Sequence, residues 1–166
     1  MNKNGAGSAM SPRTQAIVSV NLYGEDAGDC RGLGVPVIED GCESLGFVPP
    51  KGDIACYSFY GNKVITSGEG GMICGDFGDA AKWRDGGFDE NYCHDVPGLN
   101  YRMTNIQAAI ALAQLERIEA LVSARRRNAE AYASRIKGKG KWQFVAQLKD
   151  PAKAGAELNG MGVETR

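Results

Sequence analysis

Histidine is nearly absent from this chain of 166 residues, which contains only His94. A zinc site built on several imidazoles is therefore excluded, and so is the paired-histidine motif of metalloproteases. The five cysteines form no C-x-x-C pair, and their odd number argues against a disulfide framework. Reduced thiols in a cytoplasmic protein are the better interpretation of this cysteine pattern.

The chain also lacks an excess of one charge and a long apolar run. Nineteen basic residues face twenty acidic ones, so the net charge of −1 predicts no general attraction to nucleic acid or to an anionic membrane. No segment approaches the roughly 18 apolar residues of a membrane span, and the N-terminus lacks the apolar core of a signal peptide. We therefore expect no nucleic-acid and no membrane partner, and residues 1–15 are expected to form a flexible tail.

Short apolar runs bounded by turn residues predict an α/β protein with a parallel-rich sheet. Residues 16–22, 35–38, 54–59 and 72–74 are predicted strands, and the second is almost continuously apolar, as a buried parallel strand would be. The 23 glycines are about twice the usual share of roughly 7%, which indicates many tight turns. We expect a partial large domain over residues 16–103.

A long helix is predicted over residues 104–137, because apolar residues recur there at helical spacing. Thr104 and Gln107 form the T-x-x-Q pattern of a capping box, and Gly138 is a suitable stop. This helix would link the large domain to the start of a small α+β domain over residues 138–166. In that domain, residues 142–148 are a candidate strand and residues 151–159 a short helix. Residues 79–85 can form only a short helix.

One connection is unusually short. Only 12 residues, with several glycines and no helical pattern, separate Leu22 from Val35. A parallel crossover that includes a helix needs at least about 10–12 residues. Either the two strands are not parallel neighbours, or a crossover helix has been lost.

Several polar residues lie where chemistry could occur. Asp40 ends the second strand, at the edge where open α/β sheets bind ligands. Ser58 and Lys63 flank a turn, and Lys63 could grip phosphate or act as an amine nucleophile, although no Walker A pattern is present. Three successive arginines at 125–127 could bind phosphate or RNA, but successive helical positions point in different directions, which favours a solvated helix face.

Three segments resemble one protein family: VIEDGCESLG at 37–46, SFYGNKVITSGEGGM at 58–72, and GLNYRMTNIQAAIALAQLERIE at 98–119. They are similar to the pyridoxal-phosphate sugar aminotransferases of the DegT/DnrJ/StrS type, in the branch that includes GDP-perosamine synthase. The resemblance runs from about residue 16 to residue 166. It implies a fold-type I transferase in the cytoplasm that moves an amino group from glutamate to a nucleotide-linked 4-keto sugar, in O-antigen or antibiotic sugar synthesis.

The resemblance also implies roles for individual residues. Lys63 matches the catalytic lysine that links covalently to pyridoxal phosphate, and Asp40 matches the carboxylate that pairs with the pyridine nitrogen. Glu43 falls near the cofactor ring, and Ser58 matches the hydroxyl that holds the cofactor phosphate. Asn100 matches an asparagine that reaches the phosphate of the neighbouring subunit, which implies a homodimer with sites at its interface.

Three further residues carry weaker implications. His94 fits the family's Y-x-H stretch, where a substrate role, a structural role and a plain surface histidine all stay open. Tyr101 and Arg102 are candidates for substrate contact, and they are also placed to anchor the helix start and the dimer contact.

The chain departs from the family by omission. By comparison with the family, we expect the segment that supplies a second phosphate-binding turn and a stacking aromatic ring before residue 16 to be missing, and several connections to be shortened. A non-catalytic remnant or compacted fragment, which keeps an association surface and at most weak cofactor binding, is therefore the alternative to an active enzyme. A generic α/β nucleotide-binding domain is a third interpretation, but it lacks the G-x-G-x-x-G signature.

Overall fold

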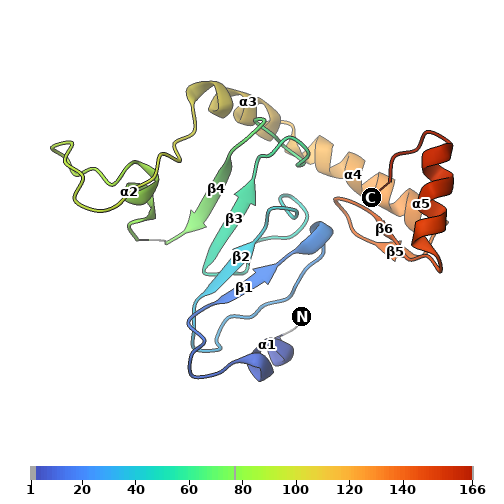
Figure 1. Ribbon diagram of the computed structural model, residues 1–166, viewed down its shortest axis with the longest axis horizontal. Helices are drawn as coiled ribbons and strands as arrows, with labels where there is room; N and C mark the ends of the chain where they lie inside the picture. The colour runs from blue at the N-terminus through green and yellow to red at the C-terminus, as the bar shows by residue number, and fades with distance from the viewer. Residues whose placement is uncertain (1–2, 77, 166) are drawn as a thin grey trace.

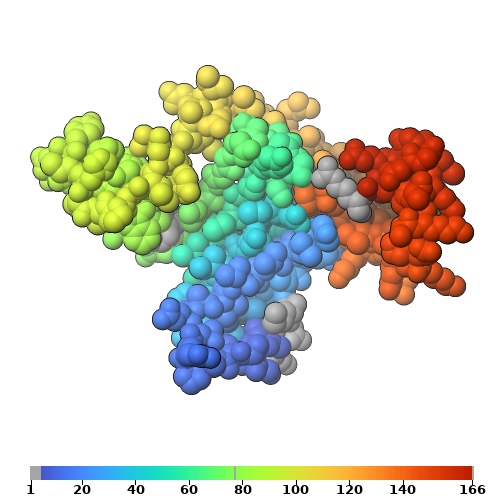
Figure 2. Space-filling model, in the orientation of Figure 1, coloured from blue at the N-terminus to red at the C-terminus, as the bar shows by residue number. Residues whose placement is uncertain are grey.

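The computed structural model describes residues 3–76 and 78–165 of the chain. A central sheet carries a helical lobe on each side (Figure 1). Residues near 80–100 project on one side and residues beyond 138 on the other, so the outline is elongated (Figure 2). The elements, in order, are α1 (Lys3–Ala9), β1 (Ile17–Val20), η1 (Leu22–Gly24), β2 (Val37–Asp40), β3 (Ile54–Ser58), β4 (Gly71–Gly75), α2 (Ala80–Arg84), α3 (Asn105–Leu115), α4 (Ile118–Ala133), β5 (Gly138–Lys139), β6 (Val145–Ala146) and α5 (Pro151–Gly160).

The sheet has the order β1-β2-β3-β4, with three parallel strands and an antiparallel β4. All four strands were predicted, and their β-branched and apolar runs explain why they form. The register pairs Asp40 of β2 with Val20 of β1 and with Cys56 of β3. The α/β, parallel-rich fold class is thus confirmed, and Asp40 lies at the carboxyl end of its strand.

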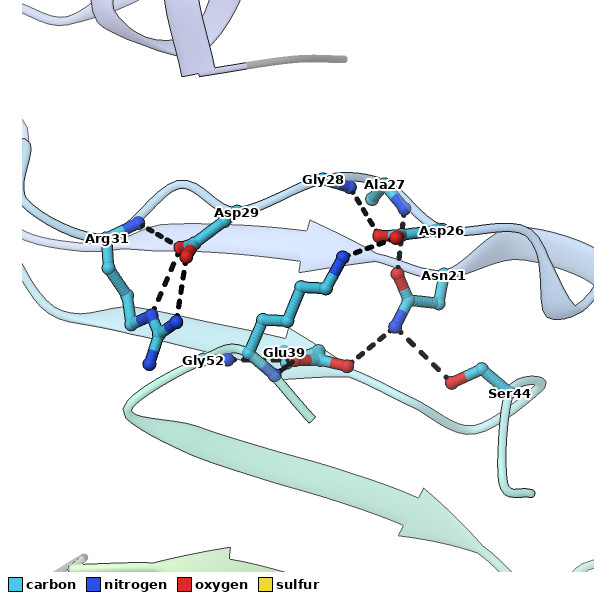
Figure 3. A network of polar contacts seen from close by, with 10 residues as sticks. Asn21, Asp26, Ala27, Gly28, Asp29, Arg31, Glu39, Ser44 and Gly52 are labelled. Carbon is cyan, nitrogen blue, oxygen red and sulfur yellow. Dashed lines mark hydrogen bonds and ion pairs between the residues drawn. The ribbon is translucent and has the colours of Figure 1, made fainter. Parts of the chain in front are cut away.

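Strands β1 and β2 are parallel neighbours although no α-helix connects them. Residues 21–36 cross over with only the single turn η1, so the second of the two alternatives, a connection without its helix, is correct. A buried carboxylate holds this loop in place (Figure 3). Glu39 accepts hydrogen bonds from Asn21 Nδ2, Lys51 N and Gly52 N at 2.6, 2.5 and 2.8 Å.

The two faces of the sheet are covered unequally. Val37 and Ala55 are buried on one face, where α1 and the crossover loop pack through Ala6 and Cys30. Strand alternation places Val18 on the opposite face, where it is 64% exposed. Asp40, Cys56 and Ser58 share that more open face.

Helix α1 differs from the flexible tail expected for residues 1–15. Residues 3–9 are helical even though two of them are glycine, a poor helix former. Ala6 is buried against Cys30 and Val37, so tertiary packing overrides local propensity. Residues 1–2 lie outside the described part of the chain.

The predicted long helix over residues 104–137 is wrong as one element, because it divides into α3 and α4. Its capping box is present as predicted: Thr104 Oγ1 accepts from Gln107 N, and Gln107 Oε1 accepts from Thr104 N. Arg117 leaves the helical region at φ −111° and ψ 8°. Ile118, the first residue of α4, contacts two apolar clusters, one around Phe59 and one around Phe47.

In the C-terminal segment the observed strand is shorter than predicted, and one side chain of the predicted strand is buried in the core. Helix α5 matches its prediction, but the predicted strand at 142–148 is reduced to β6, which pairs with β5. Trp142 is instead only 4% exposed and packs against Phe47, Val48 and Val122. No helix in residues 3–76 and 78–165 is long and apolar enough to cross a membrane.

Candidate active site

Four of the predicted site residues lie at or just after the carboxyl ends of two neighbouring strands. Asp40 ends β2 and Ser58 ends β3, while Glu43 and Lys63 lie in the turns that follow these strands. Asp40 Oδ1 accepts from Cys42 N at 3.0 Å, and Ser58 Oγ accepts from Tyr60 N at 3.2 Å. These local bonds explain why a polar residue ends each strand, because it satisfies a backbone donor of the turn.

The Lys63 amine is held between a carboxylate and an aromatic ring. Its Nζ lies 3.6 Å from Glu43 Oε1 and 4.5 Å from the centre of the Trp142 ring. The Lys63 side chain is only 15% exposed. This differs from an ordinary surface lysine, because the charged group is largely removed from water and must find partners inside the protein.

The Cys42 thiol is influenced by the charges of both Asp40 and Lys63. Burial, followed by the hydrogen bond and charge of Asp40, raises the pKa of the Cys42 thiol to about 12, while the Lys63 charge acts in the opposite direction. The Cys42 Sγ also lies 3.9 Å from the carbonyl oxygen of Cys56. One thiol therefore lies within the field of both charged groups, and it stays protonated.

The remaining predicted residues lie in another part of the molecule. Asn100 and Tyr101 are exposed in the loop that leads from α2 to α3. Helix α2 lies on the side of the sheet away from β5 and β6 (Figure 1). Asn100 pairs with Asp85 in an isolated bridge, and Arg102 Nη1 forms an ion pair with Asp85 at 2.9 Å. Within the described chain, no hydrogen bond or ion pair joins Asn100 to Lys63 or its neighbours.

His94 is fixed within the same lobe. Its Nδ1 contacts the Gly86 carbonyl oxygen at 2.7 Å, and its ring lies 4.2 Å from that of Phe88. His94, Asn100 and Arg102 line one open hollow beside α2. These contacts give His94 a structural setting, and Nδ1 is already engaged.

Sequence reasoning missed Trp142 and Tyr23. Trp142 lay in a predicted strand, and only its size and apolar character could have indicated burial. Its indole Nε1 is buried with no hydrogen-bond partner among the described residues. Tyr23 adopts φ 56° and ψ 25°, a left-handed conformation that is rare for a residue other than glycine.

The basic stretch at 125–127 fits the solvated-face interpretation. Arg126 Nη2 donates to the Gly46 carbonyl oxygen at 3.1 Å, and its guanidinium lies 5.8 Å from the Phe47 ring centre. The side chains of residues 125–127 are all exposed, in agreement with a helix face in water.

Comparison with known proteins identifies the family to which this chain belongs. Residues 1–158 match the DegT/DnrJ/EryC1/StrS aminotransferase family, and the chain belongs to that family. The GDP-perosamine synthase of Caulobacter vibrioides is 43% identical over 145 residues, which are 76% of this chain and 39% of that protein. The chain thus spans about two fifths of the length of this curated relative.

Solved structures of aminotransferase-like proteins share the fold. The aminotransferase TlmJ from Streptoalloteichus hindustanus superposes with a TM-score of 0.87 at 22% identity, over 99% of this chain and 55% of that one. The Escherichia coli GDP-4-keto-6-deoxy-D-mannose-3-dehydratase with bound hydrated pyridoxal phosphate gives 0.76 at 23% identity, over 99% and 56%. Family membership confirms pyridoxal phosphate as the cofactor predicted from the sequence.

The polar groups at the ends of β2 and β3 fit this cofactor. Asp40 offers a carboxylate for a protonated ring nitrogen, Lys63 an amine, and Ser58 a hydroxyl for a phosphate oxygen. The Trp142 Nε1, on the ring that Lys63 contacts, is a buried donor still in need of an acceptor.

Proposed function

We propose that the chain takes part in pyridoxal-phosphate-dependent transamination, in which glutamate gives its amino group to the carbonyl carbon of a nucleotide-linked 4-keto sugar. Glutamate leaves as 2-oxoglutarate, and the sugar carbonyl becomes an amine. Family membership and the likeness to GDP-perosamine synthase support this proposal. The observation that carries it is the Lys63 amine, held against Glu43 and Trp142 at the carboxyl end of the sheet.

In this proposal Lys63 is the catalytic residue. When bound, pyridoxal phosphate supplies an electron sink for the charge that develops on the substrate carbon. Lys63 Nζ would take the proton from that carbon and return it as a general base and acid. Asp40 would keep a proton on the cofactor's ring nitrogen by its negative charge, and Ser58 would hold the phosphate. Glu43 Oε1, which lies 3.6 Å from the amine, would orient it.

The proposed assembly is a homodimer. Asn100 is exposed beside His94 and Arg102, and an exposed polar side chain there is available to a partner subunit. In the proposal it reaches the phosphate in the partner's site. Sedimentation of the chain with and without cofactor tests this part separately.

The first test is cofactor attachment. We expect the purified chain mixed with pyridoxal phosphate to develop a visible absorption band, and borohydride reduction to leave a covalent adduct on Lys63. Lys63→Ala should abolish both, whereas Lys153→Ala, which changes an exposed lysine, should leave both unchanged. Amino transfer from glutamate is then measured as release of 2-oxoglutarate.

A missing band, or an equal band in Lys63→Ala, would favour the non-catalytic alternative. One observation supports that alternative: the Lys63 amine already has a carboxylate partner within the protein, Glu43. A band without amino transfer would indicate a cofactor-binding protein that is not an enzyme.

A further inference from the structure

Four residues from distant parts of the sequence close a ring of contacts around the Lys63 amine. Lys63 Nζ lies 3.6 Å from Glu43 Oε1, and Glu43 Oε2 accepts from Tyr23 N at 2.8 Å. The Tyr23 carbonyl oxygen accepts from Trp142 N at 3.1 Å, and the Trp142 ring returns to Lys63 at 4.5 Å. Each residue of the ring thus contacts the next.

The Tyr23 peptide is the strained member of this ring. A left-handed conformation costs a residue with a side chain of order 1 kcal/mol, and it persists only where the surroundings enforce it. Here both backbone polar groups are fixed, since the N–H donates to Glu43 and the carbonyl accepts from the 141–142 segment. The strain is therefore tied to the contact between the lysine site and the C-terminal segment.

Trp142 contributes two things that Glu43 does not. Its π-face attracts the ammonium group without taking a proton from it or giving one to it. Its ring is 4% exposed, so it also covers one side of the amine against water. A carboxylate and a ring on one amine leave it little freedom to rotate.

We propose that Trp142 is a positioning residue for Lys63, held in place through Tyr23, so that the segment at 138–147 belongs to the lysine site. The inference deepens the proposed function, but it concerns the amine of the chain itself. Its tests therefore use the full chain without cofactor, and they stand or fall independently of cofactor attachment.

The first test measures the acetylation rate of Lys63 with N-hydroxysuccinimide acetate at fixed pH, relative to the exposed Lys153, by peptide mass spectrometry. Trp142→Leu should raise the relative rate about fivefold, because about 1 kcal/mol of cation–π attraction corresponds to that factor and the amine also gains solvent. Trp142→Phe keeps a ring face and should stay near the parent rate. Trp83→Leu, in the other, half-exposed tryptophan, should change nothing.

Equal acceleration in the Leu and Phe variants would overturn the proposal, because packing alone would then explain the effect. An unchanged rate in Trp142→Leu would also overturn it. Circular dichroism shows whether each variant is folded.

A second measurement leaves the core intact. In a Trp83→Phe background all tryptophan emission, excited selectively over tyrosine, comes from Trp142. Lys63→Met removes the ammonium group while keeping the length of the side chain. We expect the intensity of Trp142 emission to change with this variant and to stay constant with Lys153→Met. Identical emission with and without the Lys63 amine would refute the contact.

Discussion

The buried Glu39 carboxylate gives a sharp test of how the helix-free crossover is held. Glu39 is 3% exposed, and it accepts two backbone N–H groups on one oxygen and the Asn21 amide on the other (Figure 3). The Asn21 amide cannot turn over without loss, because its Oδ1 accepts from Ala27 N at 2.9 Å. All donors in the network are therefore fixed in direction.

Glu39→Gln replaces one acceptor oxygen by a donor. Whichever way the new amide turns, its NH2 group faces an N–H, so at least one charge-assisted hydrogen bond is lost and a buried donor is left unpaired. We expect a loss of about 2–3 kcal/mol in the free energy of unfolding. Since domains of this kind are stable by only about 5–15 kcal/mol, the urea midpoint should fall clearly.

Asp29→Asn is the matched control. It makes the same chemical change in a carboxylate that is 47% exposed and paired with Arg31. A surface pair of this kind contributes at most about 1 kcal/mol. Urea unfolding followed by circular dichroism compares the two variants. If Glu39→Gln costs no more than Asp29→Asn, the view that this carboxylate holds the crossover is refuted.

Three further predictions concern stability, each measured by urea unfolding. Gly46→Ala should cost about 2–4 kcal/mol, since φ is +79° and a Cβ would lie 2.5 Å from Val122 Cγ2. Gly34→Ala, with φ +85° and no atom within 4 Å of the added Cβ, should cost only about 1 kcal/mol. Equal costs would show that the steric clash with Val122 does not destabilise the protein. The Lys51 hydrogen bond lowers the pKa of the 44%-exposed Asp26 below its ordinary 3.8, so Asp26→Asn should cost less than about 1 kcal/mol of unfolding free energy at pH 6. This difference between the variant and the parent should vanish as the pH falls through the folded-state pKa of Asp26. A difference that does not depend on pH would contradict the prediction. Thr104→Ala removes the capping box and should cost about 1 kcal/mol. An unchanged urea midpoint would mean that the capping box does not stabilise α3.

The sheet could be predicted from the sequence because each strand is a short apolar run bounded by turn residues. Such runs are typical of strands and too short for a stable helix. The end of β2 at Asp40 followed from the same pattern. The division between α3 and α4 could not be predicted, because the helical periodicity continues through Arg117. Ile118, directly after the break, packs against two apolar clusters, and such long-range contacts are not visible in the local pattern. Helix α1 likewise depends on the burial of Ala6.

The candidate site was predictable where strand geometry decides it. Parallel strands end at one edge of a sheet, and the sequence pattern indicates that Asp40 and Ser58 each lie near the end of a strand. The contact of Trp142 with Lys63 joins residues 79 positions apart, and no local pattern signals it. The left-handed Tyr23 was hidden for the same reason, since only the contacts around its peptide enforce that conformation.

The crossover loop has a consequence for how such a chain can change in length. Its two ends are tied by Asn21 and by the strand pairing of Val37, while Gly32 and Gly34 between them are exposed and adopt positive φ. Residues can be added near these two glycines at an entropic cost that grows only slowly with loop length. Such insertions would leave the strand ends, and with them Asp40, where they are.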